Sequence, residues 1–213
     1  MNVRTTVLLV DDHSVVRAGY RRLLEISGGI TVVGEAGNAT DAYHVFCSLM
    51  PDVVVMDIAL PGVSGIEGLR RILAHEPKAR VLIFSMYEDA IFARRALEAG
   101  AAGYLTKAAA PRVLVDAVAA VAAGRRFLSP DIAQTLALQP LKSEQAANVL
   151  SAREFEVLKL FADGLAPNEI AQQLGLNPKT VANHQSSIRQ KLGVETGAQL
   201  LRSAIRLGLV PPF

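Results

Sequence analysis

The sequence predicts an α/β domain with a doubly wound sheet of five parallel strands, followed by a small all-α domain of four helices. Residues 1–125 alternate five short apolar runs with five segments of helical periodicity, which is typical of strand-helix units. Residues 148–213 instead contain four segments bounded by helix-start and helix-stop signals. Between them the pattern loosens over residues 126–147, where prolines and small polar residues predict a short helix and then a flexible linker.

The predicted strands are largely apolar, and the third is continuously so between its two aspartates, as expected in a parallel sheet that helices cover on both faces. Because crossovers between parallel strands are right-handed, an open doubly wound sheet is favoured. The predicted strands are Val3–Val10, Ile30–Glu35, Asp52–Asp57, Arg80–Ser85 and Gly103–Thr106. The predicted helices are Ser14–Ile26, Asp41–Leu49, Gly65–His75, Ala90–Ala99 and Arg112–Ala123.

Local signals mark the ends of these elements. The Gly28-Gly29 pair closes the first helix, and either Asn38 or Thr40 is a suitable cap for the second. Pro51 ends that second helix, and the Pro61-Gly62 turn separates the third strand from the third helix.

Polar residues follow four of the five predicted strands. They are Asp11 and Asp12 after the first strand, Asp57 at the end of the third, Ser85 at the end of the fourth, and Lys107 after the fifth. In open α/β sheets the functional crevice lies beyond the carboxyl ends of the strands. We therefore expect three carboxylates, a hydroxyl and an ammonium group to meet at one edge of the sheet.

This set of groups indicates phosphoryl transfer. Three neighbouring carboxylates repel one another unless a cation neutralises them, and oxygen ligands suit a hard ion such as Mg²⁺. A metal and a lysine together neutralise charge on a transferring phosphoryl group. The alternative is that each acid is a separate cap or turn residue. Hydrolysis by a metal-bound water lacks an obvious general base, since His13 should begin the first helix and point outwards.

Residues 5 to 123 resemble the receiver domain of response regulators, which has a flavodoxin-like (CheY-like) fold. Five motifs carry the resemblance: Val-Leu-Leu-Val-Asp-Asp-His (7–13), Pro-Asp-Val-Val-Val-Met-Asp (51–57), Leu-Pro-Gly-Val-Ser-Gly (60–65), Leu-Ile-Phe-Ser-Met (82–86) and Gly-Tyr-Leu-Thr-Lys (103–107).

The resemblance implies a role for each polar residue at this edge. Asp57 would accept a phosphoryl group from a sensor histidine kinase. The implied Mg²⁺ ligands are Asp11, Asp12, Asp57 and the backbone carbonyl of Ala59. Lys107 would contact the acyl phosphate, and Ser85 and Tyr104 would form the switch pair.

The implied switch agrees with simple electrostatics. Phosphorylation gives Asp57 a larger anionic group that draws Ser85 towards it and vacates space for the Tyr104 ring. Without the resemblance, Tyr104 is equally well interpreted as a half-buried strand aromatic. Met86 stands where many receivers carry a small residue, so we expect partial shielding of the phosphoryl group.

The C-terminal helices carry clear boundary signals. Ser151 followed by Glu154 is a capping box that opens a helix ending at Gly164. The other predicted helices are Pro167–Leu174, Lys179–Leu192 and Thr196–Leu207. The second and third of the four helices, joined by a short turn with Gly175, have the spacing of a helix-turn-helix.

The residue pattern of the third of these helices predicts one buried apolar side and one polar side. Val181, Ile188 and Leu192 form a buried stripe with His184 near it. The opposite side carries amides, hydroxyls and lysines without acids, which are groups that bond phosphates and base edges: Lys179, Ala182, Asn183, Ser186, Ser187, Gln190 and Lys191. An ordinary amphipathic surface helix is the alternative interpretation.

Residues 150–192 resemble the LuxR-type helix-turn-helix. The motifs are Leu-Ser-Ala-Arg-Glu, Val-Leu, Gly-Leu-Ala-Pro-Asn-Glu-Ile-Ala, Leu-Gly-Leu, Lys-Thr-Val-Ala-Asn-His and Lys-Leu-Gly-Val. Joined to a receiver, such a domain is typical of NarL/FixJ-class regulators. The resemblance implies a recognition helix over Lys179–Lys191, with Thr180 at a phosphate, Asn183 facing the groove and a structural role for Glu154. The implied DNA contacts are Lys179, Thr180, Asn183, His184, Ser187 and Lys191.

Two departures from the family pattern bear on DNA affinity. Ala182 stands where many relatives carry lysine, and Ala166-Pro167 replaces the commoner Ser-Asn. Fewer cations predict fewer phosphate contacts, and hence weaker or less salt-sensitive binding.

Composition narrows the cellular setting. The chain is 51% hydrophobic and 20% charged, with a net charge of +2, and the surplus lies in residues 148–213, which hold 7 basic and 5 acidic side chains. No apolar run is long enough to span a membrane, and Met1–Val10 has no signal-peptide pattern. Cys47 is the only cysteine, which excludes an internal disulfide. We expect a cytoplasmic protein without a membrane partner.

Together these features predict a phosphorylation-controlled transcription regulator and not an enzyme, with a histidine kinase and double-stranded DNA as partners. Phosphorylation would promote a homodimer or release the DNA-binding helix, and both routes stay open. A phosphatase with an aspartyl-phosphate intermediate is disfavoured, because Ala59 replaces the second acid that one such class carries two residues after its nucleophile. A constitutive dimerisation module is a further alternative that no residue favours.

Overall fold

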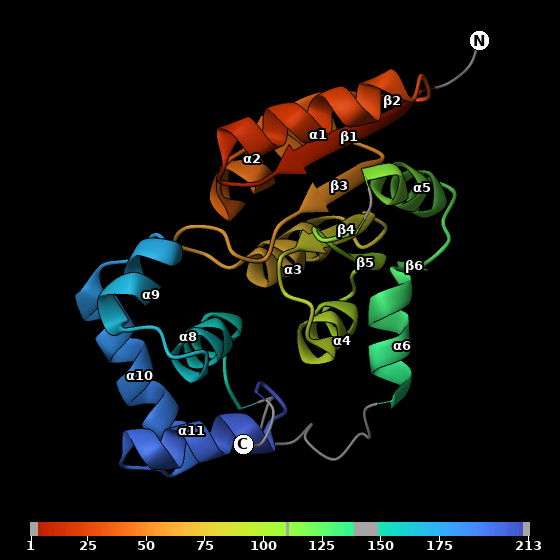
Figure 1. The fold of residues 1–213 in the computed structure, drawn as a ribbon. Coiled ribbons are helices and arrows are strands. Elements are labelled where there is room, and N and C mark those ends of the chain that lie inside the picture. The colour runs from red at the N-terminus through yellow and green to blue at the C-terminus, as the bar shows by residue number, and fades with distance from the viewer. Residues whose placement is uncertain (1–3, 110, 139–148, 211–213) are drawn as a thin grey trace. The chain divides into compact units, whose positions relative to one another are not determined.

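The computed structural model describes residues 4–109, 111–138 and 149–210 (Figure 1). The chain divides into two compact units, Met1–Ala137 and Leu138–Phe213.

The first unit is built on one parallel sheet with the strand order β2-β1-β3-β4-β5-β6. The strands are β1 (Thr5–Val10), β2 (Ile30–Ala36), β3 (Val53–Met56), β4 (Val81–Ser85), β5 (Gly103–Thr106) and β6 (Phe127–Leu128). The helices are α1 (Ser14–Ile26), α2 (Ala39–Leu49), α3 (Gly65–His75), α4 (Ala90–Glu98), α5 (Pro111–Ala122) and α6 (Pro130–Leu138). The order reverses between β1 and β3, which creates a switch point at the carboxyl ends of these two strands.

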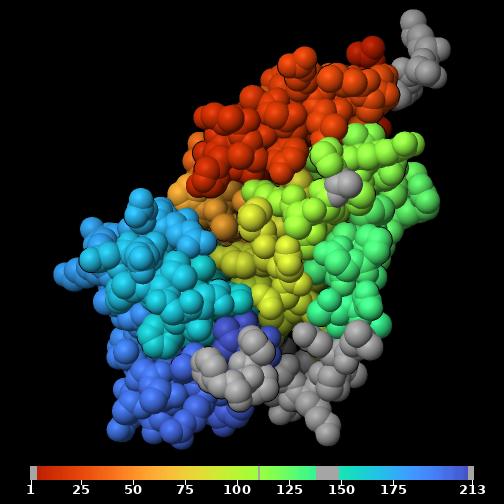
Figure 2. All heavy atoms as spheres, in the orientation of Figure 1, coloured from red at the N-terminus to blue at the C-terminus, as the bar shows by residue number. Residues whose placement is uncertain are grey.

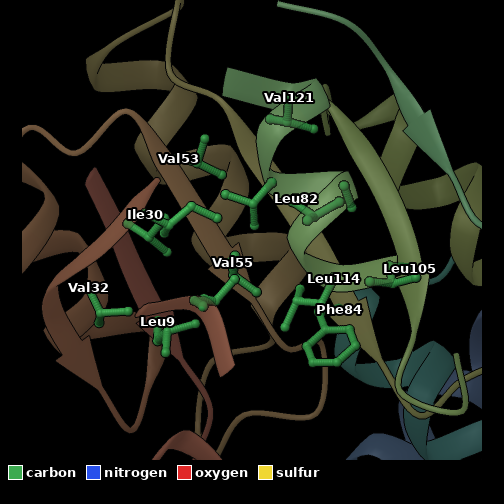
Figure 3. Packing of buried hydrophobic residues seen from close by; sticks show 14 residues of the cluster. Leu9, Ile30, Val32, Val53, Val55, Leu82, Phe84, Leu105, Leu114 and Val121 are labelled. Atoms are coloured by element: carbon green, nitrogen blue, oxygen red, sulfur yellow. The ribbon is translucent and has the colours of Figure 1, made fainter. Parts of the chain in front are cut away.

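Helices cover both faces of the sheet. Alternate residues of the strands, such as Val53 and Val55 on β3 and Leu82 and Phe84 on β4, pack against α1 and α5 (Figure 3). Helices α2 and α3 pack together on the other face, where Gly68 of α3 approaches the sulfur of Met56. Burial on both faces explains why β3, most of β4 and the second half of β1 are continuously apolar and do not alternate.

The structure confirms the predicted architecture and adds one strand. All ten predicted strands and helices of residues 1–125 are present, with ends shifted by at most two residues. Asn38 is the residue that caps α2, because its side-chain oxygen accepts a hydrogen bond from the backbone N–H of Asp41 (2.8 Å).

The sixth strand, β6, is the difference. The sequence predicts five strands, but Phe127 and Leu128 pair in parallel with Gly103 and Tyr104. A strand of two residues is too short to show any period, so periodicity could not reveal it. Helix α6 follows β6, where the sequence predicts a short helix, and it belongs to the first compact unit up to Ala137. Part of the predicted linker, residues 139–147, lies outside the described residues.

The second unit contains four described helices, as predicted: α8 (Ala152–Ala162), α9 (Pro167–Gln173), α10 (Pro178–Leu192) and α11 (Gly197–Arg206). The capping box of Ser151 and Glu154 opens α8, and Gly193 ends α10 in the left-handed conformation with φ of 64°. Helix α10 packs against both α8 and α9, which is the arrangement of a helix-turn-helix.

The outer side of α1 is exposed along its length, with Val15 at 83% and Ile26 at 73% exposure (Figure 2). Among the residues that the structure describes, none belongs to a helix both long and apolar enough to cross a membrane.

Candidate functional site

The switch point between β1 and β3 brings two carboxylates together. Val10 and Met56 are partners in the parallel ladder, so Asp11 and Asp57, the next residues along each strand, emerge at the same edge. Asp11 is 5% exposed and Asp57 is 4% exposed. Two buried carboxylates at one place require a compensating cation.

Lys107, the residue that follows β5, supplies that cation. Its Nζ lies 2.6 Å from Oδ2 of Asp11 and 2.5 Å from Oδ2 of Asp57. The backbone N–H of Lys107 donates to the carbonyl oxygen of Ser85 (2.8 Å), which holds the lysine at the end of β5. The structure thus joins side chains from residues 11, 57 and 107 in one buried ion-pair cluster.

Burial and ion pairing have opposite effects on the pKa values of Asp57 and Lys107. Burial raises the pKa of Asp57, Lys107 opposes that rise, and the charge of Asp11 adds to it. Burial alone would lower the pKa of Lys107, but the two carboxylates hold it above its ordinary value. Lys107 therefore stays charged at neutral pH.

Asp12 and His13 border the cluster on its open side. The side chain of Asp12 is 28% exposed, and its Oδ1 lies 2.7 Å from Nδ1 of His13. The possible ligand atoms of Asp11, Asp12 and His13 lie within 4.8 Å of one another. His13 is largely exposed, as predicted, and its imidazole faces the two carboxylates of its own loop.

The donor set fits Mg²⁺. Asp11, Asp12 and Asp57 offer carboxylate oxygens, which hard divalent cations prefer. The backbone N–H of Ala59 donates to Oδ1 of Asp57 (3.3 Å), so the loop of the predicted carbonyl ligand folds against the same carboxylate.

The predicted switch residues lie buried in the sheet next to this cluster. Ser85 and Tyr104 are both 0% exposed, so the ring of Tyr104 is turned fully inwards. The Tyr104 hydroxyl donates to the backbone carbonyl of Tyr87 (2.7 Å), and the backbone N–H of Tyr87 donates to Oγ of Ser85 (3.2 Å). Burial raises the pKa of Tyr104, so its hydroxyl remains a donor. Met86, expected to shield the site in part, is 70% exposed.

Sequence reasoning did not assign a role to Arg17 or Gly65, and both residues support the site. Arg17 donates from Nη1 to the backbone carbonyl of Asp11 and from Nε to Glu35 (3.2 Å). A Cβ on Gly65 would lie 1.8 Å from the carbonyl oxygen of Asp57, so this position must be glycine. The Leu-Pro-Gly-Val-Ser-Gly motif contains Gly65, but only the folded chain shows what this glycine touches.

In the second unit, α10 presents the predicted polar face. Lys179 and Asn183 are exposed, whereas Thr180 and His184 are half-buried. Burial lowers the pKa of His184, so its imidazole is neutral at pH 7. On the opposite side Val181 and Ile188 are buried as predicted. Gln185 is buried in addition, while Leu192 is only half-buried.

Two of the predicted DNA contacts have partners inside the unit. Oγ of Ser187 donates to Oε1 of Glu154 (2.6 Å), and Nζ of Lys191 lies 2.6 Å from Oε2 of the same carboxylate. Glu154 also receives the backbone N–H of Ser151 (2.7 Å), which completes its capping box. Glu154 thus has the structural role that the sequence suggested.

Comparisons with known proteins identify both units. The model of the response regulator receiver domain matches residues 7–119, and the model of bacterial regulatory proteins of the luxR family matches residues 148–204. The response regulator UvrY of Escherichia coli (strain K12) is 40% identical over 206 residues, which cover 95% of this chain and 94% of UvrY.

Solved structures agree. A two-component response regulator of the LuxR family from Aurantimonas sp. SI85-9A1 matches with a TM-score of 0.62 and 51% identity, covering 63% of this chain and 96% of that one. A structure of two RcsB dimers bound to two parallel DNAs matches with a TM-score of 0.62 and 29% identity, covering 96% and 99% of the two chains. The chain therefore belongs to the two-component response regulators of the NarL/FixJ class, in which a receiver domain is joined to a LuxR-type helix-turn-helix domain.

Proposed function

We propose that this response regulator controls transcription through phosphorylation of Asp57 by a sensor histidine kinase. The observation that carries the proposal is the contact of one ammonium group, Lys107 Nζ, with both Asp11 and Asp57 at the switch point of the sheet. A buried carboxylate beside a fixed cation and further acids is the arrangement that phosphoryl transfer to an aspartate requires.

In the proposed reaction, a carboxylate oxygen of Asp57 attacks the phosphorus of a phosphohistidine. A P–O bond forms as the P–N bond breaks, and the departing histidine nitrogen takes the bonding electron pair. The ammonium of Lys107 sits beside the accepting oxygen and offsets the negative charge that arrives. The proposed Mg²⁺ ligands are Asp11, Asp12, Asp57 and the carbonyl of Ala59, and the ion would neutralise phosphoryl oxygens when bound.

The response to phosphorylation is proposed to pass through Ser85 and Tyr104. Ser85 would turn its hydroxyl towards the phosphoryl oxygens, which would loosen the bond that it now accepts from Tyr87. Tyr104 is hydrogen-bonded to the same residue from the other side, so a shift of the loop after β4 would be felt by α4.

The output is proposed to be binding of double-stranded DNA by α10. The proposed contacts are Lys179, Thr180, Asn183 and His184, while Ser187 and Lys191 lie on the same helix in contact with Glu154. RcsB, which is 29% identical over 96% of this chain, has been solved as dimers bound to DNA, and this supports a homodimer that engages two half-sites. Since bacterial DNA lies in the cytoplasm, we propose that the protein acts there.

The test is Mg²⁺-dependent labelling of the full chain by a small phosphodonor such as acetyl phosphate. Asp57→Asn keeps the size of the side chain and removes the nucleophile, so labelling should disappear. Asp116→Asn, at an exposed position on α5, is the matched control and should label normally. Persistent labelling of Asp57→Asn would refute the site. A shift to dimer with beryllofluoride, absent in Asp57→Asn, would then connect the site to assembly.

A further inference from the structure

The carboxylate of Glu154 connects two helices of the DNA-binding domain. Glu154 lies in the first turn of α8, and its side chain is 6% exposed. Oε1 accepts from Ser187, and Oε2 lies within 2.7 Å of both the Ser151 N–H and the Lys191 ammonium. One side chain therefore caps α8 and holds two residues of α10.

The two residues held on α10 occupy a particular position around that helix. Ser187 and Lys191 are four residues apart and so lie one above the other on the same side. At 3.6 residues per turn they fall between the buried stripe of Val181 and Ile188 and the exposed face that carries Asn183. Contacts on this flank add to the apolar packing of α10 on α8 and α9 in opposing rotation of α10 about its axis.

The same contact changes the charge that α10 offers to a polyanion. Helix α10 carries no acidic residue, and Lys179 and Lys191 are its exposed cations. The carboxylate of Glu154 offsets the charge of Lys191. It makes no such ion pair with Lys179. A lysine held by a buried carboxylate is less free to neutralise phosphates than one in solvent.

Glu154 keeps its charge at neutral pH. Burial tends to raise the pKa of this carboxyl, but the hydrogen bonds from Lys191, Ser187 and Ser151 together lower it to about 2. The bridge between α8 and α10 is therefore ionic under the conditions in which DNA is bound.

We propose that Glu154 is a positioning residue for DNA recognition, which fixes the rotation of α10 through Ser187 and Lys191 and withholds Lys191 from general phosphate binding. The inference rests on the proposed role of α10 in DNA binding. Glu154 would therefore increase the discrimination between DNA sequences and decrease the overall affinity for DNA. A residue that only capped α8 would have no such effect.

The key variant is Glu154→Gln, because a glutamine at this position still completes a capping box while the negative charge is lost. The matched control is Glu169→Gln. Glu169 accepts the backbone N–H of Ala166 (2.7 Å) at the start of α9 and plays the same capping role there. Comparing the two variants separates the cap from the bridge to α10.

The experiment uses the full chain treated with beryllofluoride. Sequence preference is measured by selection from a pool of randomised DNA duplexes, and affinity for one mixed-sequence duplex is measured over a series of salt concentrations. Glu154→Gln should lose roughly tenfold or more of the preference for selected over mixed duplex. Its log K against log salt should steepen by about one, as one more phosphate contact would produce. Glu169→Gln should match the original chain in both.

A second variant keeps the test decisive if thermal unfolding shows that Glu154→Gln is not folded. Lys191→Met should leave the salt slope unchanged, because Lys191 is proposed to be engaged by Glu154. A slope that falls by about one in Lys191→Met, or a Glu154→Gln chain that matches Glu169→Gln, would overturn the inference. Absence of duplex binding by the original chain would instead overturn the proposed function, and the inference with it.

Discussion

The hydroxyl of Tyr104 donates a 2.7 Å hydrogen bond to the backbone carbonyl of Tyr87, seventeen residues earlier in the chain. The ring of Tyr87 stacks on Phe92 of α4 with a centroid separation of 4.1 Å and an interplanar angle of 6°. The backbone N–H of Tyr87 also reaches Ser85. The inward Tyr104 therefore stabilises one conformation of the loop between β4 and α4, and α4 is coupled to it through the stacked rings.

Tyr104→Phe should test this coupling. The substitution keeps the buried ring and removes one hydrogen bond, so the receiver should lose about 1 kcal/mol of stability. Urea unfolding followed by fluorescence gives this value as a change in midpoint at constant slope. Tyr20→Phe is the control, because Tyr20 is a half-buried tyrosine whose ring packs edge-on against Phe84, and it should change stability by less.

If Tyr104 acts only as a core aromatic, the dimer shift with beryllofluoride should be the same in Tyr104→Phe and the original chain. We expect it to be smaller in Tyr104→Phe, since the loop after β4 would be held less firmly in the inward state. Sedimentation velocity measures the shift directly.

Lys107→Met should reveal the cost of the buried acids. Without the ammonium, Asp11 and Asp57 face each other uncompensated, and loss of one partner of a buried ion pair costs about 3–5 kcal/mol. Mg²⁺ should recover part of this loss, because it replaces the missing positive charge. The melting temperature of Lys107→Met should therefore rise more with Mg²⁺ than that of the original chain.

The control for this prediction is Lys78→Met, since Lys78 is exposed after α3 and far from the acids in sequence. Its stability and its response to Mg²⁺ should match the original chain. An equal response to Mg²⁺ in all three proteins would show that the acids and the lysine do not share one site.

Gly65→Ala should damage the site through its backbone. The added methyl carbon would lie 1.8 Å from the carbonyl oxygen of Asp57, so α3 or the loop after β3 must move. Overpacking of this kind costs about 1–3 kcal/mol or more. Gly19→Ala offers a contrast, because Gly19 lies inside α1 with open space around its Cβ position. That substitution should stabilise the receiver by about 0.5–1 kcal/mol through helix propensity.

Thermal unfolding of both alanine variants checks this pair of predictions. A Gly65→Ala protein as stable as the original, with normal phosphodonor labelling, would contradict the close approach of α3 to Asp57.

The central strands of the fold could be predicted because they are buried on both faces. Runs such as Val53–Met56 are apolar throughout for that reason, and helix caps such as Ser151 with Glu154 use local signals. The convergence of Asp11, Asp57 and Lys107 followed from one topological rule, since all three come directly after parallel strands.

What could not be predicted depends on side chains that reach across elements. The contact of Arg17 with the carbonyl of Asp11 depends on how α1 lies over β1, and no periodicity encodes it. The sequence places Ser187 and Lys191 on the polar flank of α10, but it does not show that Glu154, which is 33 and 37 residues earlier, contacts both. Composition of a helix face gives its polarity, and only tertiary structure shows which of its groups are free.

Stability at low pH should depend on Glu154. Its pKa of about 2 in the folded protein lies below the ordinary value of 4.5, so the folded state holds fewer protons at this group. The stabilisation is therefore fully present above about pH 4.5 and is lost as the pH falls towards 2. We expect this stabilisation to be on the order of 1–3 kcal/mol.

Glu154→Gln should be less stable than the original chain at pH 6, and the difference should shrink as the pH approaches 2. Urea unfolding of the DNA-binding domain signal at several pH values measures this, with Glu169→Gln as the control. A difference that stays constant from pH 6 to pH 2 would mean that the Glu154 carboxylate is not held by Ser187 and Lys191 in solution.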